Sequence, residues 1–160
     1  MSERNSEVVS PYLGEIHWDA GCELHFPAGL PGFELHTRMV PVEIPSQRPL
    51  IYLQSAEKGE ICFLALPVLT VHPGFRLRLS EDDLSLLDLD ESGTATGEYP
   101  ALGTDVLCLA LLVPFESTVQ TNLDAPIVIN LHNGRGVQTV SPATAGSYRL
   151  SRSGAWEVVC

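Results

Sequence analysis

The sequence predicts an all-β protein, a small antiparallel β-barrel-like domain with one or two short helices. Three observations support this class. Short segments in which apolar and polar residues alternate recur along the chain, turn signals separate them every 8 to 12 residues or so, and only one short segment carries a clear helix-start pattern. With 160 residues, of which 44% are apolar, the chain is long enough for one compact domain with its own core.

The first elements are two strands over 15–19 and 22–26, joined into a hairpin by a turn at Ala20-Gly21. Their alternation places Cys22 on the core face. The segment 26–33 follows with two prolines and two glycines, so we expect a rigid loop. Phe33 in this loop has two interpretations: a core plug at one end of the barrel, which general burial statistics favour, or an exposed aromatic anchor for a partner.

The middle of the chain continues with strands and then a helix. Pro41 restricts the first of these strands to an edge or bulged position, because proline donates no hydrogen bond to a ladder. Ser80 is a typical helix N-cap, followed by three acidic residues that favour the positive end of the helix dipole. The predicted strands are 40–44, 50–54, 61–66 and 75–79, and the helix begins near Glu81.

The last third of the domain is again β-patterned, after a loop over 90–100. The continuous apolar run 106–113 fits a strand buried on both faces. Asn133-Gly134 lies between two β-patterned runs and is a strong hairpin signal. Strands are therefore predicted at 106–113, 117–122, 127–131 and 136–140, the last two forming the hairpin.

The domain organisation follows from where the patterning stops. We expect a loosely ordered arm over 1–13, a domain over 14–150 and a tail over 151–160. The polar start shows no signal peptide, and the longest apolar run is far shorter than the roughly 20 residues of a membrane helix. A soluble, cytoplasmic monomer is the expectation.

The charge distribution narrows the class of partner. Nine Lys and Arg stand against twenty Asp and Glu, which gives a net charge of −11, and residues 79–134 contain neither Lys nor Arg. A negative field repels nucleic-acid phosphates and anionic membranes. We therefore expect the protein to bind neither of them directly. A basic protein partner would be attracted.

Catalytic and metal-binding patterns are missing from the sequence. The four cysteines are widely separated, with no Cys-x-x-Cys, and strand periodicity separates Cys22 from His25. Glu81, Asp82 and Asp83 are better explained as a charged first helical turn than as a paired-carboxylate site, because three adjacent exposed acids lack the enclosing pocket that such a site requires. We expect no enzyme activity, no metal and no cofactor.

The candidate partner-binding residues come from the loop at Phe33 and Glu34, from the acidic helix start, and from two amides at predicted strand ends. The acids of the helix start could also form an electrostatic landing patch for a basic partner, and Arg76 and Arg78 could pair with them. The two amides have a simpler interpretation, since they usually satisfy turn backbone. The candidates are Phe33, Glu34, Gln54, Glu81, Asp82, Asp83 and Asn122.

Four motifs in order give the sequence a resemblance to a known family. They are Phe26-Pro-Ala-Gly-Leu-Pro-Gly-Phe-Glu34, Leu53-Gln-Ser55, Thr121 to Asn130, and Gly136-Val-Gln138 with Tyr148. This collinear set resembles the flagellar assembly factor FliW family, with departures at Leu66-Pro67 and Gly74-Phe75. The resemblance implies a non-enzymatic cytoplasmic protein that binds flagellin and also CsrA, a small basic RNA-binding regulator, and so prevents CsrA from repressing flagellin synthesis.

An alternative from a different class is a small β-barrel ligand-binding or hydrolase domain. That class needs convergent polar side chains that line an apolar cavity in the mouth of the barrel.

Overall fold

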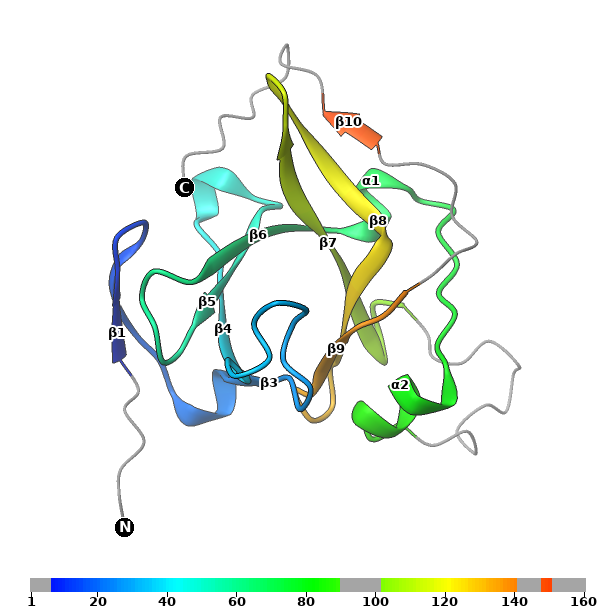
Figure 1. Cartoon of the computed structure of the whole chain (residues 1–160), viewed down its shortest axis with the longest axis horizontal. Coiled ribbons are helices and arrows are strands. Elements are labelled where there is room, and N and C mark those ends of the chain that lie inside the picture. Colours follow the sequence, from blue (N-terminus) through cyan, green and yellow to red (C-terminus); the bar gives the residue numbers. More distant parts are fainter. Residues whose placement is uncertain (1–6, 90–101, 141–147, 151–160) are drawn as a thin grey trace.

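The computed structural model describes residues 7–89, 102–140 and 148–150 and confirms the predicted fold class. Its main sheet is antiparallel and curls into a nearly closed barrel, with strands in the order β10-β8-β7-β6-β5-β4-β3 and β9 paired to β8 (Figure 1). The strands are β3 (Leu24–His25), β4 (Arg38–Val42), β5 (Ile51–Ser55), β6 (Cys62–Pro67), β7 (Val106–Phe115), β8 (Thr118–Asn130), β9 (Gly136–Gln138) and β10 (Tyr148–Leu150).

A separate hairpin corrects the expectation for the start of the chain. Strand β2 (Gly14–His17) pairs with β1 (Glu7–Ser10), not with the segment after Ala20-Gly21, so the hairpin predicted over 15–26 was wrong. Ala20-Gly21 instead lies in the short 3₁₀ helix η1 (Ala20–Cys22). Cys22 is exposed, contrary to the predicted core position, because this turn removes it from the strand alternation. The arm expected over 1–13 thus contains a paired strand.

Strand β3 closes the barrel. It pairs with β4 on one side, and on the other the His25 N–H donates to the Gly134 carbonyl at 2.9 Å. Because β3 has only two residues, β4 is flanked on that side only at Arg38 and Met39. Pro41 therefore lies on a stretch of β4 paired with β5 alone, which fits its expected edge position.

The sheet is buried on both faces, which explains the continuous apolar run in β7. Leu109 faces the barrel interior with Phe26 and Leu30, whereas Cys108 and Ala110 belong to a second core on the outer face. A third cluster, around Tyr52, lies on the outer face of β5 and β6. Strands covered on both sides lose the polar alternation of a half-exposed strand.

The second half of the sheet is a long hairpin of β7 and β8. The runs 117–122 and 127–131, predicted as separate strands, belong to the single strand β8. The pairing of β7 with β8 shifts in register between Leu109 and Leu111. The predicted hairpin at Asn133-Gly134 is confirmed: β9 pairs with β8, and Gly134 adopts a φ of 74°.

The predicted strand at 75–79 was wrong. Its alternation is real, since Phe75 is buried and Leu77 and Leu79 pack against the same core, while Arg76 and Arg78 are exposed. The segment nevertheless joins no strand ladder. Period-two alternation reports which side chains are buried, and here burial against β7 and β8 produces it without pairing.

Short helices cover the outer core. The predicted helix is present as α2 (Glu81–Leu86), and α1 (Val68–Val71) follows β6 directly. The 3₁₀ helix η2 (Pro45–Gln47) joins β4 to β5. Among the described residues, no helix is long and apolar enough to span a membrane. The expected loop over 90–100 and the tail over 151–160 lie outside the described residues.

The two cysteines Cys22 and Cys108 should react very differently with alkylating reagents. Burial raises the pKa of the Cys108 thiol to about 12, so at pH 8 its thiolate fraction is on the order of 10⁻⁴. We expect iodoacetamide to label exposed Cys22 in the native protein and to label Cys108 only after unfolding, as read by peptide mass spectrometry. Equal native labelling of both would contradict this burial.

Candidate partner-binding surfaces

The acidic turn at the start of α2, residues Glu81 to Asp83, has the structure that the sequence predicts. Ser80 accepts a hydrogen bond from the Asp83 N–H at 3.1 Å through its side chain, which confirms it as the N-cap. Glu81 and Asp82 are exposed, whereas Asp83 is half-buried and accepts a hydrogen bond from the Thr139 hydroxyl at 2.5 Å. Two of the three carboxylates are therefore free to face a partner.

Side chains of the β8–β9 hairpin hold α2 in place. Asn130 and Asn133 both donate to the Leu87 carbonyl, at 2.9 and 3.1 Å, and the Arg135 Nε donates to the Leu86 carbonyl at 2.8 Å. These donors satisfy carbonyls that the end of a helix leaves unpaired. Sequence reasoning missed them, because 43 to 49 residues separate the donors from the helix.

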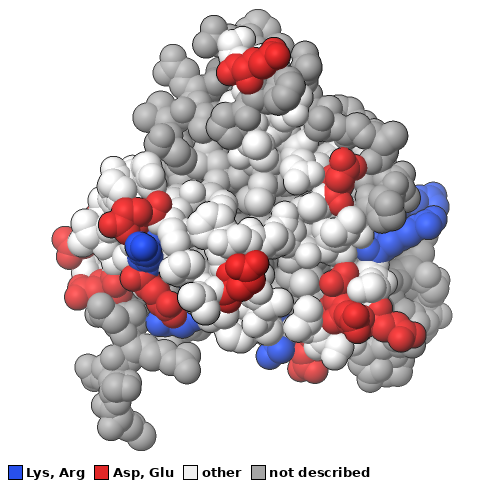
Figure 2. Space-filling model, in the orientation of Figure 1, with Lys and Arg blue, Asp and Glu red and all other residues white. Residues whose placement is uncertain are grey.

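Acidic side chains gather over α2, at the lower right of Figure 2, and again around the β1–β2 side of the molecule, at the left. No ion pair among the described residues joins Arg76 or Arg78 to the acidic turn, so the pairing expected for these arginines is not present. The turn thus keeps its negative charge uncompensated by them.

The loop over 26–37 is a second candidate surface. Leu30 is 2% exposed and packs inside the barrel, whereas Phe33 is 37% exposed and lies edge-on to Phe63 with ring centroids 5.1 Å apart. The interpretation of Phe33 as the core plug was therefore wrong, and Leu30 has that position. Both residues are apolar and lie three apart in one irregular loop, so periodicity could not distinguish them.

Beyond Phe33 the loop presents Glu34 and Leu35 to solvent. Leu35 is 88% exposed, an unusual state for leucine. The Gly32 N–H donates to the Glu34 carboxylate at 3.0 Å, and this bond, together with the Glu34 backbone, lowers the pKa of the carboxyl. The bond is therefore present above the ordinary pKa of glutamate and is lost as the pH falls through the lowered value.

Of the two predicted strand-end amides, Gln54 is fully buried and cannot contact a partner directly. Its side-chain nitrogen lies 3.1 Å from the carbonyl oxygens of Ser55, Gly59 and Ile61, while its Oε1 lacks a hydrogen-bond partner within the described chain. These bonds hold the turn between β5 and β6. Asn122 is half-buried and accepts from the Asp124 N–H at 3.2 Å. The Gln54 bonds match the simpler interpretation of a satisfied turn, whereas Asn122 lies inside strand β8 and not at a strand end.

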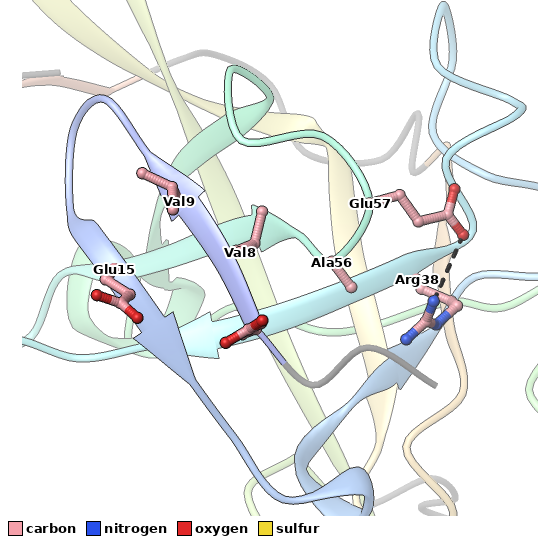
Figure 3. Close-up of a pocket in the computed structure, with 7 residues that line it drawn as sticks. Val8, Val9, Glu15, Arg38, Ala56 and Glu57 are labelled. Carbon is pink, nitrogen blue, oxygen red and sulfur yellow. Dashed lines mark ion pairs between the residues drawn. The ribbon is translucent and has the colours of Figure 1, made fainter. Parts of the chain in front are cut away.

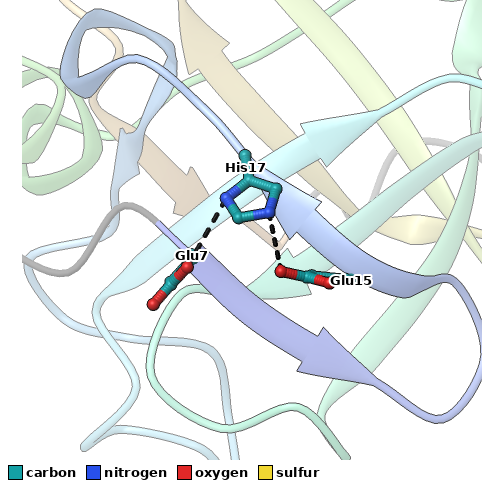
Figure 4. Close-up of side chains that lie close together, drawn as sticks. All are labelled: Glu7, Glu15 and His17. Atoms are coloured by element: carbon teal, nitrogen blue, oxygen red, sulfur yellow. Dashed lines mark hydrogen bonds and ion pairs between the residues drawn. The ribbon is translucent and has the colours of Figure 1, made fainter.

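One group of possible metal ligands occurs within the described ranges: Glu7, Glu15 and His17, all exposed (Figure 4). His17 Nδ1 lies 3.5 Å from Glu7, and its Nε2 lies 2.9 Å from Glu15. Each carboxylate thus contacts a different ring nitrogen, so the imidazole lies between the two carboxylates on one face of the hairpin.

The alternative of a ligand cavity in the barrel mouth finds no support in the described barrel interior. Apolar side chains fill that interior, among them Phe26, Leu30 and Met39. Convergent polar groups around an apolar cavity, the feature which that class requires, are not found among them.

The fold and these surfaces define a small β-barrel protein with an acidic exterior and an exposed apolar loop. The model of the family described as FliW protein matches residues 7–151. A protein of Oceanobacillus iheyensis named flagellar assembly factor FliW is 31% identical over 78% of this chain and 79% of its own. One of Syntrophomonas wolfei with the same name is 27% identical over 84% and 81%.

A solved structure supports the same fold. The crystal structure of a flagellar assembly factor FliW covers 87% of this chain and 91% of its own, with a TM-score of 0.71 and 24% identity. Taken with the family match, these comparisons show that the chain belongs to the FliW family.

Proposed function

We propose that this protein is a non-enzymatic flagellar assembly factor that binds flagellin and CsrA in the cytoplasm, and that it relieves the repression of flagellin synthesis by CsrA. The observation that carries the proposal is the family match over residues 7–151. The relatives named above are called flagellar assembly factors, which supports a role in flagellar assembly for this chain.

Electrostatics supports the second partner independently. CsrA is a basic RNA-binding protein, and a chain of net charge −11 attracts such a partner while repelling the RNA that CsrA binds. The exposed carboxylates of Glu81 and Asp82, on a helix fixed to the barrel, offer this charge at a defined place.

The function as a whole is tested in a reconstituted translation reaction. CsrA should repress a reporter that carries the flagellin leader, addition of this protein should restore translation, and flagellin added afterwards should restore repression by competing for it. Repression that persists at excess protein would reject the proposal.

The double variant Glu81→Gln/Asp82→Asn should slow association with CsrA and flatten its dependence on salt. Both carboxylates are exposed and contribute to the field that steers a basic partner, and steering weakens as salt screens it. Asp83 is left unchanged, because its carboxylate binds Thr139. The measurement is the association rate by surface binding kinetics at several salt concentrations.

A matched control removes the same charge elsewhere. Asp19 and Glu60 are exposed and lie outside α2, so Asp19→Asn/Glu60→Gln tests for an effect of total charge alone. Equal salt slopes for the two double variants would dismiss the acidic turn as the landing patch and leave its acids as helix-capping residues.

A further inference from the structure

The β1–β2 hairpin stands apart from the barrel sheet. The two strands pair with each other and with no other described strand, so each keeps one edge outside any ladder (Figure 1). Backbone groups at such an edge are a template for another extended chain. The hairpin therefore has strand edges outside any ladder, although Leu13 at its turn packs against the third core cluster.

A groove separates this hairpin from the barrel. It is an open depression of about 550 Å³ whose walls come from β1, β2, β4 and the turn after β5 (Figure 3). The residues that line it are Glu7, Val8, Val9, Glu15, Arg38, Ala56 and Glu57.

The groove carries surplus negative charge. Glu7, Glu15 and Glu57 contribute three exposed carboxylates from three separate segments, the first two of them beside the His17 ring. Its one cation, Arg38, already has partners: Glu23 accepts two hydrogen bonds from the guanidinium, at 2.9 and 2.6 Å, and Glu57 lies 3.8 Å away. The Glu23 hydrogen bond, foremost among the causes, raises the pKa of Arg38, so this cation stays bound to its carboxylates.

The groove also offers apolar contact and a fixed width. Half-buried Val8 and the edge of Ala56, which is 5% exposed, lie in its lining, and Val9 is 71% exposed. At one end the hairpin abuts the turn after β5, where a Cβ on Gly59 would lie 1.9 Å from the Val9 carbonyl oxygen. Only glycine permits this approach, which positions the hairpin against the barrel.

We propose that this groove docks a basic extended segment of a protein partner, in which lysine or arginine alternates with small apolar residues. Alternation with period two directs the cations to Glu7, Glu15 and Glu57 and the apolar side chains to Val8 and Ala56. Charge complementarity selects this occupant over an acidic or neutral peptide. The inference needs neither CsrA nor flagellin, so it stands or falls separately from the proposed function.

The test measures binding of a fluorescent eight-residue peptide of alternating lysine and valine by anisotropy, with the full-length protein. We expect the triple variant Glu7→Gln/Glu15→Gln/Glu57→Gln to weaken binding about tenfold or more. Asp19→Asn/Glu116→Gln/Asp124→Asn removes the same charge from exposed sites outside both the groove and the acidic turn, and should leave affinity within about twofold of the unchanged protein. Circular dichroism and thermal melting establish that each variant is folded.

Other outcomes would overturn the proposal. Equal losses in the two triple variants would mean general charge attraction, and an unchanged affinity in the groove variant would place the peptide elsewhere. A glutamate-valine peptide that binds as well would remove the electrostatic basis. Binding of spermine with the affinity of the peptide would indicate a site for small cations. Self-association in sedimentation that the groove substitutions abolish would make a second copy of this chain the occupant.

Discussion

Leu30→Ala is expected to lower the free energy of unfolding by about 2–5 kcal/mol, the range for truncating a buried leucine. Leu30 is 2% exposed and packs inside the barrel with Phe26 and Met39. Its removal leaves a cavity that the barrel strands, held by hydrogen bonds on both sides, fill only in part. Urea denaturation followed by circular dichroism gives the change, and an unaltered slope shows that the shift in midpoint is a change in stability.

Phe33→Ala in the same loop is the matched comparison. Phe33 is 37% exposed and packs edge-on against Phe63, a pair worth about 0.5–1.5 kcal/mol beyond the area it buries, so its loss should cost less than the loss of the fully buried Leu30 side chain. The larger residue is thus expected to matter less for stability. A greater loss for Phe33→Ala than for Leu30→Ala would restore Phe33 as the plug of the barrel.

Gly29→Ala is expected to destabilise the protein by clearly more than Gly32→Ala. Both glycines have positive φ, 65° and 85°, so alanine at either position costs about 1–2 kcal/mol in backbone strain. At Gly29 a Cβ would also lie 2.5 Å from the Glu34 Cα, a backbone atom that moves only with the loop, whereas at Gly32 nothing lies within 4 Å. The difference between the two midpoints in urea isolates this close approach.

The same pair of variants also tests whether the close approach at Gly29 fixes the shape of the loop that presents Glu34. Gly29→Ala must displace the backbone at Glu34, and with it the exposed residues on either side, while Gly32→Ala leaves that space free. Equal stability of the two variants would show that the loop relaxes without strain and that its shape is not set by the crossing at Gly29.

The sequence predicted the fold class, most strands, the Asn133-Gly134 hairpin and the capped helix, because each depends on residues close together in the chain. It failed where pairing partners had to be chosen. Alternation over 15–19 and 75–79 reported burial correctly in part, but alternation does not say which strand, if any, pairs with a segment. The strand at Glu7–Ser10 was missed for the same reason, because its own pattern is weak and it forms a strand by pairing with β2.

The sequence predicted several residues of the candidate surfaces, but not the contacts that hold these residues in place. The acids of α2 were found from their N-cap signal, whereas the hairpin side chains that fix this helix are remote in sequence. The groove beside β1 was missed altogether, because its carboxylates come from three segments that no local pattern connects. Phe33 and Leu30 could be separated only by knowing which of them the loop turns inward.

The closure of the barrel at β3 has a consequence for its local opening. One backbone bond, from His25 to Gly134, and an isolated bridge to Arg135 join this strand to the β8–β9 hairpin, whereas neighbouring strands elsewhere are joined by longer ladders. Separation along this seam therefore breaks few backbone bonds, and we expect local opening of the barrel wall to begin there. Because Gly134 is in the hairpin that holds α2, such an opening would loosen the acidic turn and uncover Phe26 in a single event.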